Sequence, residues 1–150
     1  MLISRIRRVL YDVERIKRRQ DDIYALPLLQ NAIGNVFLPF TPFSLNPFTL
    51  LQILNEITIN DRQVIVELGS GISTIAISKF IKRQQLNATL ISIDENADWM
   101  RFVKSQLEEY SCLNSCILIH APLTKVQSPS VAKFGSSSCG CPQFLDSSLR

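Results

Sequence analysis

Apolar positions follow two different spacings along this chain. Short continuous apolar runs lie at about 63–68, 89–94 and 116–120, which is typical of buried strands. Between these runs, the segments at about 72–84 and 96–110 place an apolar residue every three or four positions, which predicts amphipathic helices. Because helix and strand alternate regularly, we expect an α/β fold with about three parallel strands.

Each predicted helix has one apolar face, which we expect to pack on the sheet. The apolar positions of the first helix are Ile72, Ile75, Ala76 and Phe80. Those of the second helix are Trp99, Phe102, Val103 and Leu107. An earlier helix is predicted to begin at Asn46-Pro47 and to continue to about residue 58. Asparagine is a favoured N-cap, and proline fits the first helical position.

Residues 2–23 have apolar residues at helical spacing, and their polar positions are mostly basic. The apolar positions are Leu2, Ile6, Val9, Val13, Ile16 and Ile23. Residues 1–20 contain seven arginines and lysines against two acids, although the whole chain has a net charge of only +3. We predict a basic amphipathic helical extension over 1–30 that packs on the main domain. The alternatives are a short coiled coil or partner-binding arm, and an arm for a membrane surface or nucleic acid.

Residues 31–48 form a predicted linker that is rich in proline and phenylalanine. Its segment 34–48 holds three prolines and four of the eight phenylalanines. Proline at this density excludes regular structure, whereas the phenylalanines favour a linker that is ordered against the domain. We assign 49–123 to the α/β domain. Residues 124–150 are rich in serine and have no apolar periodicity, so we predict a disordered tail.

The composition fits one globular domain of a cytoplasmic protein. The 150 residues are 46% hydrophobic, which is enough for one core. Since no run of about 18 apolar residues is present, we expect no transmembrane helix, and the basic N-terminus lacks the apolar segment of a secretory signal. We therefore expect the four cysteines to be reduced. Their spacing does not match the common zinc-binding pairs, and no metal site is predicted.

The candidate chemistry lies where the first predicted strand meets its helix. The strand reaches Glu67 near its end, and Gly69, Ser70 and Gly71 form a turn. Glycines in such a turn permit a positive φ and let a ligand approach the backbone. The following helix directs its free N–H groups and its positive dipole end into the same space, which favours an anion. Asp94 ends the second strand, where it can accept hydrogen bonds from two ribose hydroxyls.

This combination of strand, glycine turn, helix and acid-ended strand predicts a site for an adenosine-containing cofactor. Two classes of cofactor compete for it. A dinucleotide fingerprint would place a third glycine at position 74, where this chain has Thr74. An NAD-dependent oxidoreductase fragment is therefore the weaker alternative.

The segment Val64-Ile-Val-Glu-Leu-Gly-Ser-Gly71 resembles the first motif of class I S-adenosylmethionine-dependent methyltransferases, which have a Rossmann-like fold. Segments 44–48, 92–99 and 119–123 are similar to further landmarks of one bacterial-type subgroup, so the resemblance extends over roughly half of the chain. It implies that S-adenosyl-L-methionine binds with Glu67, Gly69 and Gly71 along its methionine part. It also implies that Asp94 takes the ribose hydroxyls.

Four more residues are candidate contacts of that cofactor. Ser70 offers a hydroxyl at the turn, and Glu95 is an alternative partner for the ribose. Trp99 is either a residue of the helix core or an aromatic side chain beside the adenine. His120 is the only histidine, and we expect it at the rim of the pocket, because nothing in the sequence supplies the partner that would orient it as a base. The methyl acceptor is not identified, and no catalytic residue is assigned.

The chain offers fewer strands than the resemblance implies, because no strand pattern with a following helix appears after residue 123. We therefore expect a truncated gene product that holds the cofactor-binding half of a methyltransferase. The main alternative is a truncated or degenerate domain without catalytic activity. The 63–68 strand would have one unpaired apolar edge, through which we expect self-association.

Overall fold

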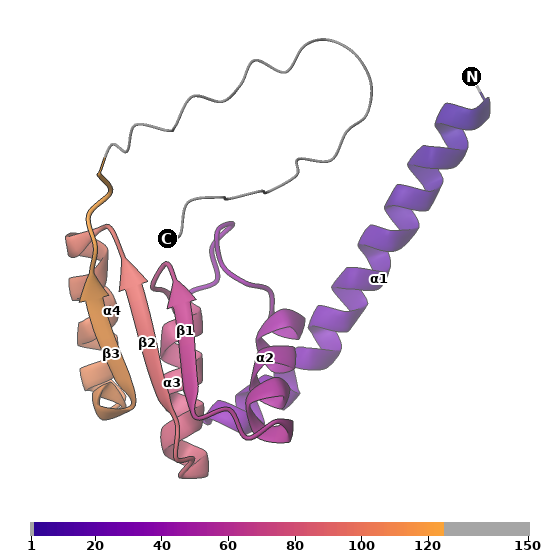
Figure 1. Cartoon of the computed structure of the whole chain (residues 1–150). Helices are drawn as coiled ribbons and strands as arrows, with labels where there is room; N and C mark the ends of the chain where they lie inside the picture. Colours follow the sequence, from indigo (N-terminus) through magenta and orange to yellow (C-terminus); the bar gives the residue numbers. More distant parts are fainter. Residues whose placement is uncertain (1, 125–150) are drawn as a thin grey trace, which may run out of the picture.

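The predicted alternation of helices and strands is present in the structure, a computed structural model that describes residues 2–124 (Figure 1). The elements in chain order are α1 (Leu2–Ile33), α2 (Pro47–Ile59), β1 (Val64–Leu68), α3 (Ile72–Gln84), β2 (Thr89–Asp94), α4 (Ala97–Glu109), the 3-10 turn η1 (Leu113–Ser115) and β3 (Cys116–His120). The α/β class with three strands and an N-terminal helix is therefore confirmed, and the arrangement is that of a partial Rossmann-like fold.

The three strands form one parallel sheet in the order β1-β2-β3. Glu67 of β1 is paired with Ser92 of β2, and Asp94 of β2 is paired with His120 of β3. This register brings the carboxyl ends of all three strands to one edge of the sheet. Ligands of open parallel sheets bind at that edge.

Helices α3 and α4 cover one face of the sheet (Figure 1). The predicted buried face of α3 is confirmed, because Ile72, Ile75, Ala76 and Phe80 are all buried. On α4, Val103 and Leu107 are buried as predicted. The prediction for Trp99 and Phe102 was wrong, since these side chains are 37% and 39% exposed. They belong to the first half of α4, where Trp99 turns towards the β1–α3 turn and stacks on Phe102.

The opposite face of the sheet is apolar and open. In residues 2–124 no helix covers it, and its most exposed side chains are Val64, Val66, Leu68, Ile117 and Ile119. Strand β1 has no strand partner on its outer edge within the same residues. Parallel sheets are normally covered on both faces, so this surface is available for further apolar contact.

Helix α2 begins as the sequence predicts. The Asn46 side chain accepts a hydrogen bond from the Thr49 N–H at 2.8 Å, and Pro47 occupies the first turn. Leu50 and Leu54 of α2 are buried together with Leu29 of α1 in the main core. Helix α2 thereby joins α1 to the sheet layer.

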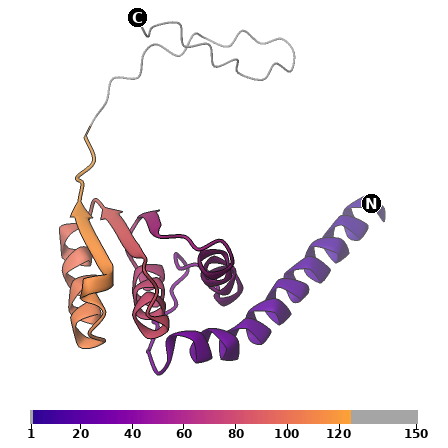
Figure 2. The same ribbon diagram turned by 60° about the horizontal axis from the view of Figure 1, so that its bottom comes forward.

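Helix α1 is longer than predicted and packs differently. It runs through Pro27 to Ile33, and only its C-terminal part enters the core, through Ala25, Leu29 and Ile33. The expectation that residues 2–23 pack on the domain was wrong, because this part of α1 projects from the body in both views (Figures 1 and 2). Of its apolar side chains, Val9, Ile16 and Ile23 lie on the side of the helix opposite Ala25, because an α-helix turns about 100° per residue.

Residues 34–46 contain no helix or strand, as the proline content predicts. A turn at 41–44 is closed by the Ser44 N–H, which donates to the Thr41 carbonyl oxygen at 3.0 Å. The predicted tail lies outside the described residues from position 125 onward, as do Cys139 and Cys141. Of the helices described, none is both long enough and apolar enough to cross a membrane.

Replacing Leu54 with alanine is expected to lower the free energy of unfolding by about 3 kcal/mol, because it leaves a cavity between α1 and the rest of the core. Leu54 is 1% exposed, whereas Ile59 on the same helix is 79% exposed. The matched variant Ile59→Ala should therefore change stability by less than about 0.5 kcal/mol. Urea unfolding followed by far-UV circular dichroism measures both, and equal losses would contradict the packing described for α2.

Candidate functional site

The turn between β1 and α3 exposes bare backbone to open space. Gly69 has a φ of +92°, a conformation that L side chains rarely adopt, and its N–H donates to the Ile93 carbonyl oxygen at 2.7 Å. Gly71 has an extended φ of 175°, which any residue can adopt. A Cβ placed on either glycine would meet no heavy atom within 4 Å. The packing of the protein therefore does not require glycine at position 71, and the missing side chain leaves room in front of the turn.

Two cavities meet at this turn. The larger has a volume of about 680 Å³ and is lined by Pro39 and residues 41–45 of the linker, residues 67–73 of the turn, and Trp99. The smaller, of about 300 Å³, lies towards β2 and β3 and is lined by Leu68, Gly69, Ile93, Asp94, Glu95, Ala121 and Leu123. Because both cavities share Leu68 and Gly69, an elongated ligand could extend across the turn from one into the other.

Asp94 accepts three hydrogen bonds, two of which hold it against the turn. Its Oδ2 accepts from the Ser70 N–H at 2.6 Å and from the Ser70 hydroxyl at 2.9 Å, and its Oδ1 accepts from the Asn96 N–H at 2.8 Å. Burial acts to raise the pKa of Asp94, but these donors outweigh it, and the pKa lies below its ordinary value. Asp94 is therefore an anion at neutral pH, next to the glycine turn.

Glu67 is a second carboxylate at the turn, in a different environment. It is half-buried, and it accepts a hydrogen bond from the hydroxyl of Thr74, which is fully buried. The same Thr74 oxygen accepts from the Gly71 N–H at 2.8 Å. Burial raises the pKa of Glu67, and the hydroxyls of Thr74, Ser92 and Ser73 only partly offset this effect. The charge of Asp94 adds to the increase.

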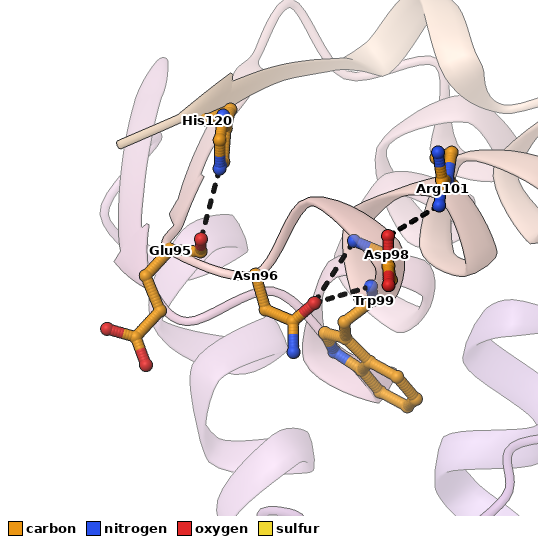
Figure 3. Close-up of polar contacts among 6 residues, drawn as sticks. All are labelled: Glu95, Asn96, Asp98, Trp99, Arg101 and His120. Carbon is orange, nitrogen blue, oxygen red and sulfur yellow. Dashed lines mark hydrogen bonds and ion pairs between the residues drawn. The ribbon is translucent and has the colours of Figure 1, made fainter. Parts of the chain in front are cut away.

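Trp99 is fixed between α4 and the turn. Asn96 caps α4, since its side-chain oxygen accepts from the N–H groups of Asp98 and Trp99 at 3.0 Å each (Figure 3). The indole Nε1 of Trp99 donates to the Ser70 carbonyl oxygen at 2.7 Å, and its ring stacks on Phe102 with centroids 5.1 Å apart. This places a partly exposed aromatic side chain in the wall of the larger cavity.

His120 lies beside the smaller cavity without lining it. Its Nε2 is 3.0 Å from the carbonyl oxygen of Glu95, as Figure 3 shows. A carbonyl oxygen only accepts hydrogen bonds, so this contact requires the proton on Nε2. The Glu95 carboxylate points away from His120 and from Asn96, and it is exposed (Figure 3).

The structure divides the predicted site residues into two groups around the turn. Gly69 borders both cavities, and the larger cavity adds Glu67, Ser70, Gly71 and Trp99. The smaller cavity adds Asp94 and Glu95, and His120 stands outside both cavities.

Sequence reasoning missed three polar residues and one loop of this site. The sequence offers Thr74 as a hydroxyl at the turn, but it does not predict that this hydroxyl joins Glu67 to the Gly71 N–H. Asn96 carries a readable signal, because asparagine directly before a helix is a favoured N-cap. Ser92 and part of the 41–45 loop belong to segments that carry the family resemblance, but only the packing of β2 and the path of the linker bring them to this site.

The cysteines of the described chain are buried thiols. Cys112 and Cys116 are both free, and burial raises the pKa of each, that of Cys116 to about 11. Both remain protonated at neutral pH, which makes them poor nucleophiles and poor metal ligands. Residues 2–124 contain no cluster of three or more histidine, cysteine or acidic side chains that could hold a metal ion.

Comparison of the chain with protein-family models, with curated proteins and with solved structures gave no match in any of the three.

The variant Asp94→Asn should lose stability at pH 7, by about 1 kcal/mol, because the amide is a weaker acceptor than the carboxylate for the Ser70 and Asn96 donors. The folded pKa of Asp94 lies below the ordinary value of 3.8, so its stabilising effect is present above pH 3.8 and is lost as the pH falls through the folded pKa. Urea unfolding across this range should show the two proteins converge at acid pH. The exposed control Asp61→Asn should change the stability at pH 7 by less than about 0.5 kcal/mol.

The variant Glu67→Gln should show the opposite pH dependence. Because the folded pKa of Glu67 lies above its ordinary value of 4.5, its stabilising effect is present below pH 4.5 and is lost as the pH rises through the folded pKa. The stability of Glu67→Gln relative to the parent protein should therefore increase between pH 4.5 and pH 8. The exposed control Glu109→Gln should change the stability at pH 7 by less than about 0.5 kcal/mol. A difference for Glu67→Gln that does not change with pH would contradict the burial described here.

Proposed function

We propose that this chain binds S-adenosyl-L-methionine and is the cofactor-binding part of a methyltransferase. The observation that carries the proposal is the bare backbone at Gly71. No contact within the protein and no unusual φ explains a glycine there, whereas a ligand lying against the turn does. The family resemblance of the first motif points to the same ligand.

The size and lining of the cavities fit such a ligand. Small-molecule sites commonly enclose about 300–1,000 Å³ and combine apolar walls with a few polar groups. The larger cavity, of about 680 Å³, lies within that range. Its walls are Trp99 and the proline- and phenylalanine-containing loop, and its polar side is the turn with Glu67.

The turn and α3 suit the amino-acid part of the cofactor. The first N–H groups of a helix have no partner within the helix, and the helix dipole favours negative charge at that end. The N-terminus of α3 begins at Ile72, directly after Gly71, and borders the larger cavity. It would bind the carboxylate, while Glu67 would attract the ammonium group of the same ligand.

Asp94 suits the ribose hydroxyls. A carboxylate offers about four acceptor positions, and the protein occupies three of those on Asp94. One of the three is held by the Ser70 hydroxyl, which rotates freely enough to release it. Asp94 also lines the smaller cavity, so a nucleoside there would lie within its reach.

When bound, the cofactor supplies an electrophilic methyl group on a sulfonium sulfur, and this group carries the intrinsic reactivity. The residues of the chain contribute binding and orientation. Trp99, fixed by the Ser70 carbonyl oxygen, and the loop at 41–45 form walls of the larger cavity in front of the turn. The methyl acceptor would approach from the open side of the larger cavity.

The position of Thr74 weighs against a dinucleotide. A third glycine at that position lets a helix pack closely beneath a pyrophosphate. Thr74 is instead fully buried and uses its hydroxyl to link Glu67 with the Gly71 N–H. The turn is therefore stabilised by a side chain that the dinucleotide fingerprint lacks.

Isothermal titration with S-adenosylhomocysteine tests the proposal. We expect saturable binding by the parent protein and at least a tenfold loss in Gly71→Leu, because a side chain at this position would enter the space of the ligand. The fold should tolerate the change, since a Cβ there meets nothing within 4 Å. A thermal melt of Gly71→Leu provides that control, and Gly71→Ala should lose less affinity than Gly71→Leu.

Two outcomes would contradict the proposal. A well-folded parent protein that binds no S-adenosylhomocysteine would indicate a domain without this cofactor. Preferential binding of NADH, measured in the same titration, would favour the oxidoreductase alternative.

A further inference from the structure

Helix α1 has two apolar faces, and only one of them contacts other elements within residues 2–124. Ala25, Leu29 and Ile33 are buried in the core. Ile16 and Ile23 belong to the other face and are 57% and 71% exposed. An α-helix turns about 100° per residue, so Ile23 and Ala25 point about 200° apart around the axis. The exposed face is therefore not a continuation of the core-facing one, and it has no cover within the described chain.

The exposed face follows a heptad repeat. Ile6, Val13 and Gln20 fall on the a positions of the repeat, and Val9, Ile16 and Ile23 fall on the d positions. The five apolar members are each more than half exposed. A regular a/d seam on a long helix is the pattern through which helices associate in coiled coils. A polar residue at a single a position, here Gln20, is a known device for fixing the register.

One pair of charges beside this seam is complementary between parallel copies. Asp12 occupies a g position, and Lys17 occupies the e position five residues later. In a parallel coiled coil, a g side chain lies next to the e side chain of the following heptad on the neighbouring helix, so Asp12 of one copy would face Lys17 of another. An antiparallel arrangement brings like positions together instead and would not form this pair.

The shape of the molecule leaves room for such an association. Residues 6–23 span about 27 Å of helix. This part of α1 projects from the body, as both views show (Figures 1 and 2). Parallel copies could therefore join along this part of α1, with their α/β bodies together at its C-terminal end.

The side chains of the seam determine how many copies fit. Isoleucine or valine occupies two of the three a positions and all three d positions. Isoleucine at both a and d shifts the preference from two strands to three or four. Leu10 and Tyr24 occupy e positions and are 60% and 71% exposed. They widen the apolar face, which also favours more than two strands.

From these observations we propose that three copies of this chain associate through a parallel coiled coil formed by residues 6–23 of α1. This association is independent of the cofactor proposed above. Anionic lipid would attract Arg5, Lys17 and Arg19 beside the seam, but it would repel Asp12, which has a partner only in the association of parallel copies.

The mass of the full-length chain in solution tests the proposal. Size-exclusion chromatography with light scattering should give three times the chain mass of 17.0 kDa. Ile16→Glu places a charge in the seam and should raise the apparent dissociation constant at least tenfold. Tyr11→Glu is the matched control, because Tyr11 is also exposed on α1 but lies at an f position away from the seam, and it should keep the trimer. Far-UV circular dichroism checks that both variants remain folded.

A charge reversal tests the parallel arrangement separately. Lys17→Asp should weaken the association, because it brings two acids together at the seam. Adding Asp12→Lys in the same chain restores opposite charges and should recover most of the lost affinity. Recovery would not follow if Lys17 acted only through the helix propensity of α1 or through lipid.

Several results would overturn the proposal. The first is a parent protein with the mass of a single chain at concentrations up to about 100 μM, well above the micromolar range of weak specific association. The second is dissociation by Val66→Lys on the open sheet face together with no effect of Ile16→Glu, which would place the interface on the sheet. The third is a single-chain mass combined with flotation on phosphatidylserine vesicles, which would assign α1 to a membrane surface. A mass of two or four chains would overturn the strand number.

Discussion

The parallel pairing of β1 with β2 is the constraint on which the site depends. Strand β1 leads into the glycine turn, and strand β2 ends at Asp94. The register of the two strands sets the distance between the turn and this carboxylate. The Ser70 N–H and hydroxyl then bind Asp94 across the gap, and the Gly69 N–H binds the Ile93 carbonyl oxygen. A shift of one residue in this pairing would turn the Asp94 side chain to the other face of the sheet and separate it from the turn.

The two carboxylates at the turn, Asp94 and Glu67, lie in different environments. Asp94 accepts three hydrogen bonds and stays ionised, whereas burial disfavours the ionised form of Glu67. Thr74 stabilises the arrangement because one hydroxyl serves both Glu67 and the Gly71 N–H. A pair of acids at one turn therefore offers two different partners to a ligand: a fixed anion beside the smaller cavity and a more weakly ionised group beside the larger one.

Two apolar surfaces remain uncovered in the described chain, and they have different characters. The open sheet face is an apolar patch that extends from β1 to β3, and its exposed side chains include Val66 and Ile117. The exposed face of α1 is a narrow seam with an internal repeat and with charges at defined positions beside it. Apolar area alone selects no partner. A heptad repeat with flanking charges sets the register and the relative direction of the associating helices, and the seam therefore supports a specific association.

Local sequence determined most of the elements. The strand and helix ranges, the Asn46 cap and the buried face of α3 follow from short-range periodicity and capping, which act within one or two turns of the chain. Tertiary structure alone decided the direction of α1, the exposure of Trp99, the place of the 41–45 loop in the cavity wall and the link from Thr74 to Glu67. Each of these depends on contacts between segments that are distant along the chain or on the path of the linker, and periodicity along the chain does not contain that information.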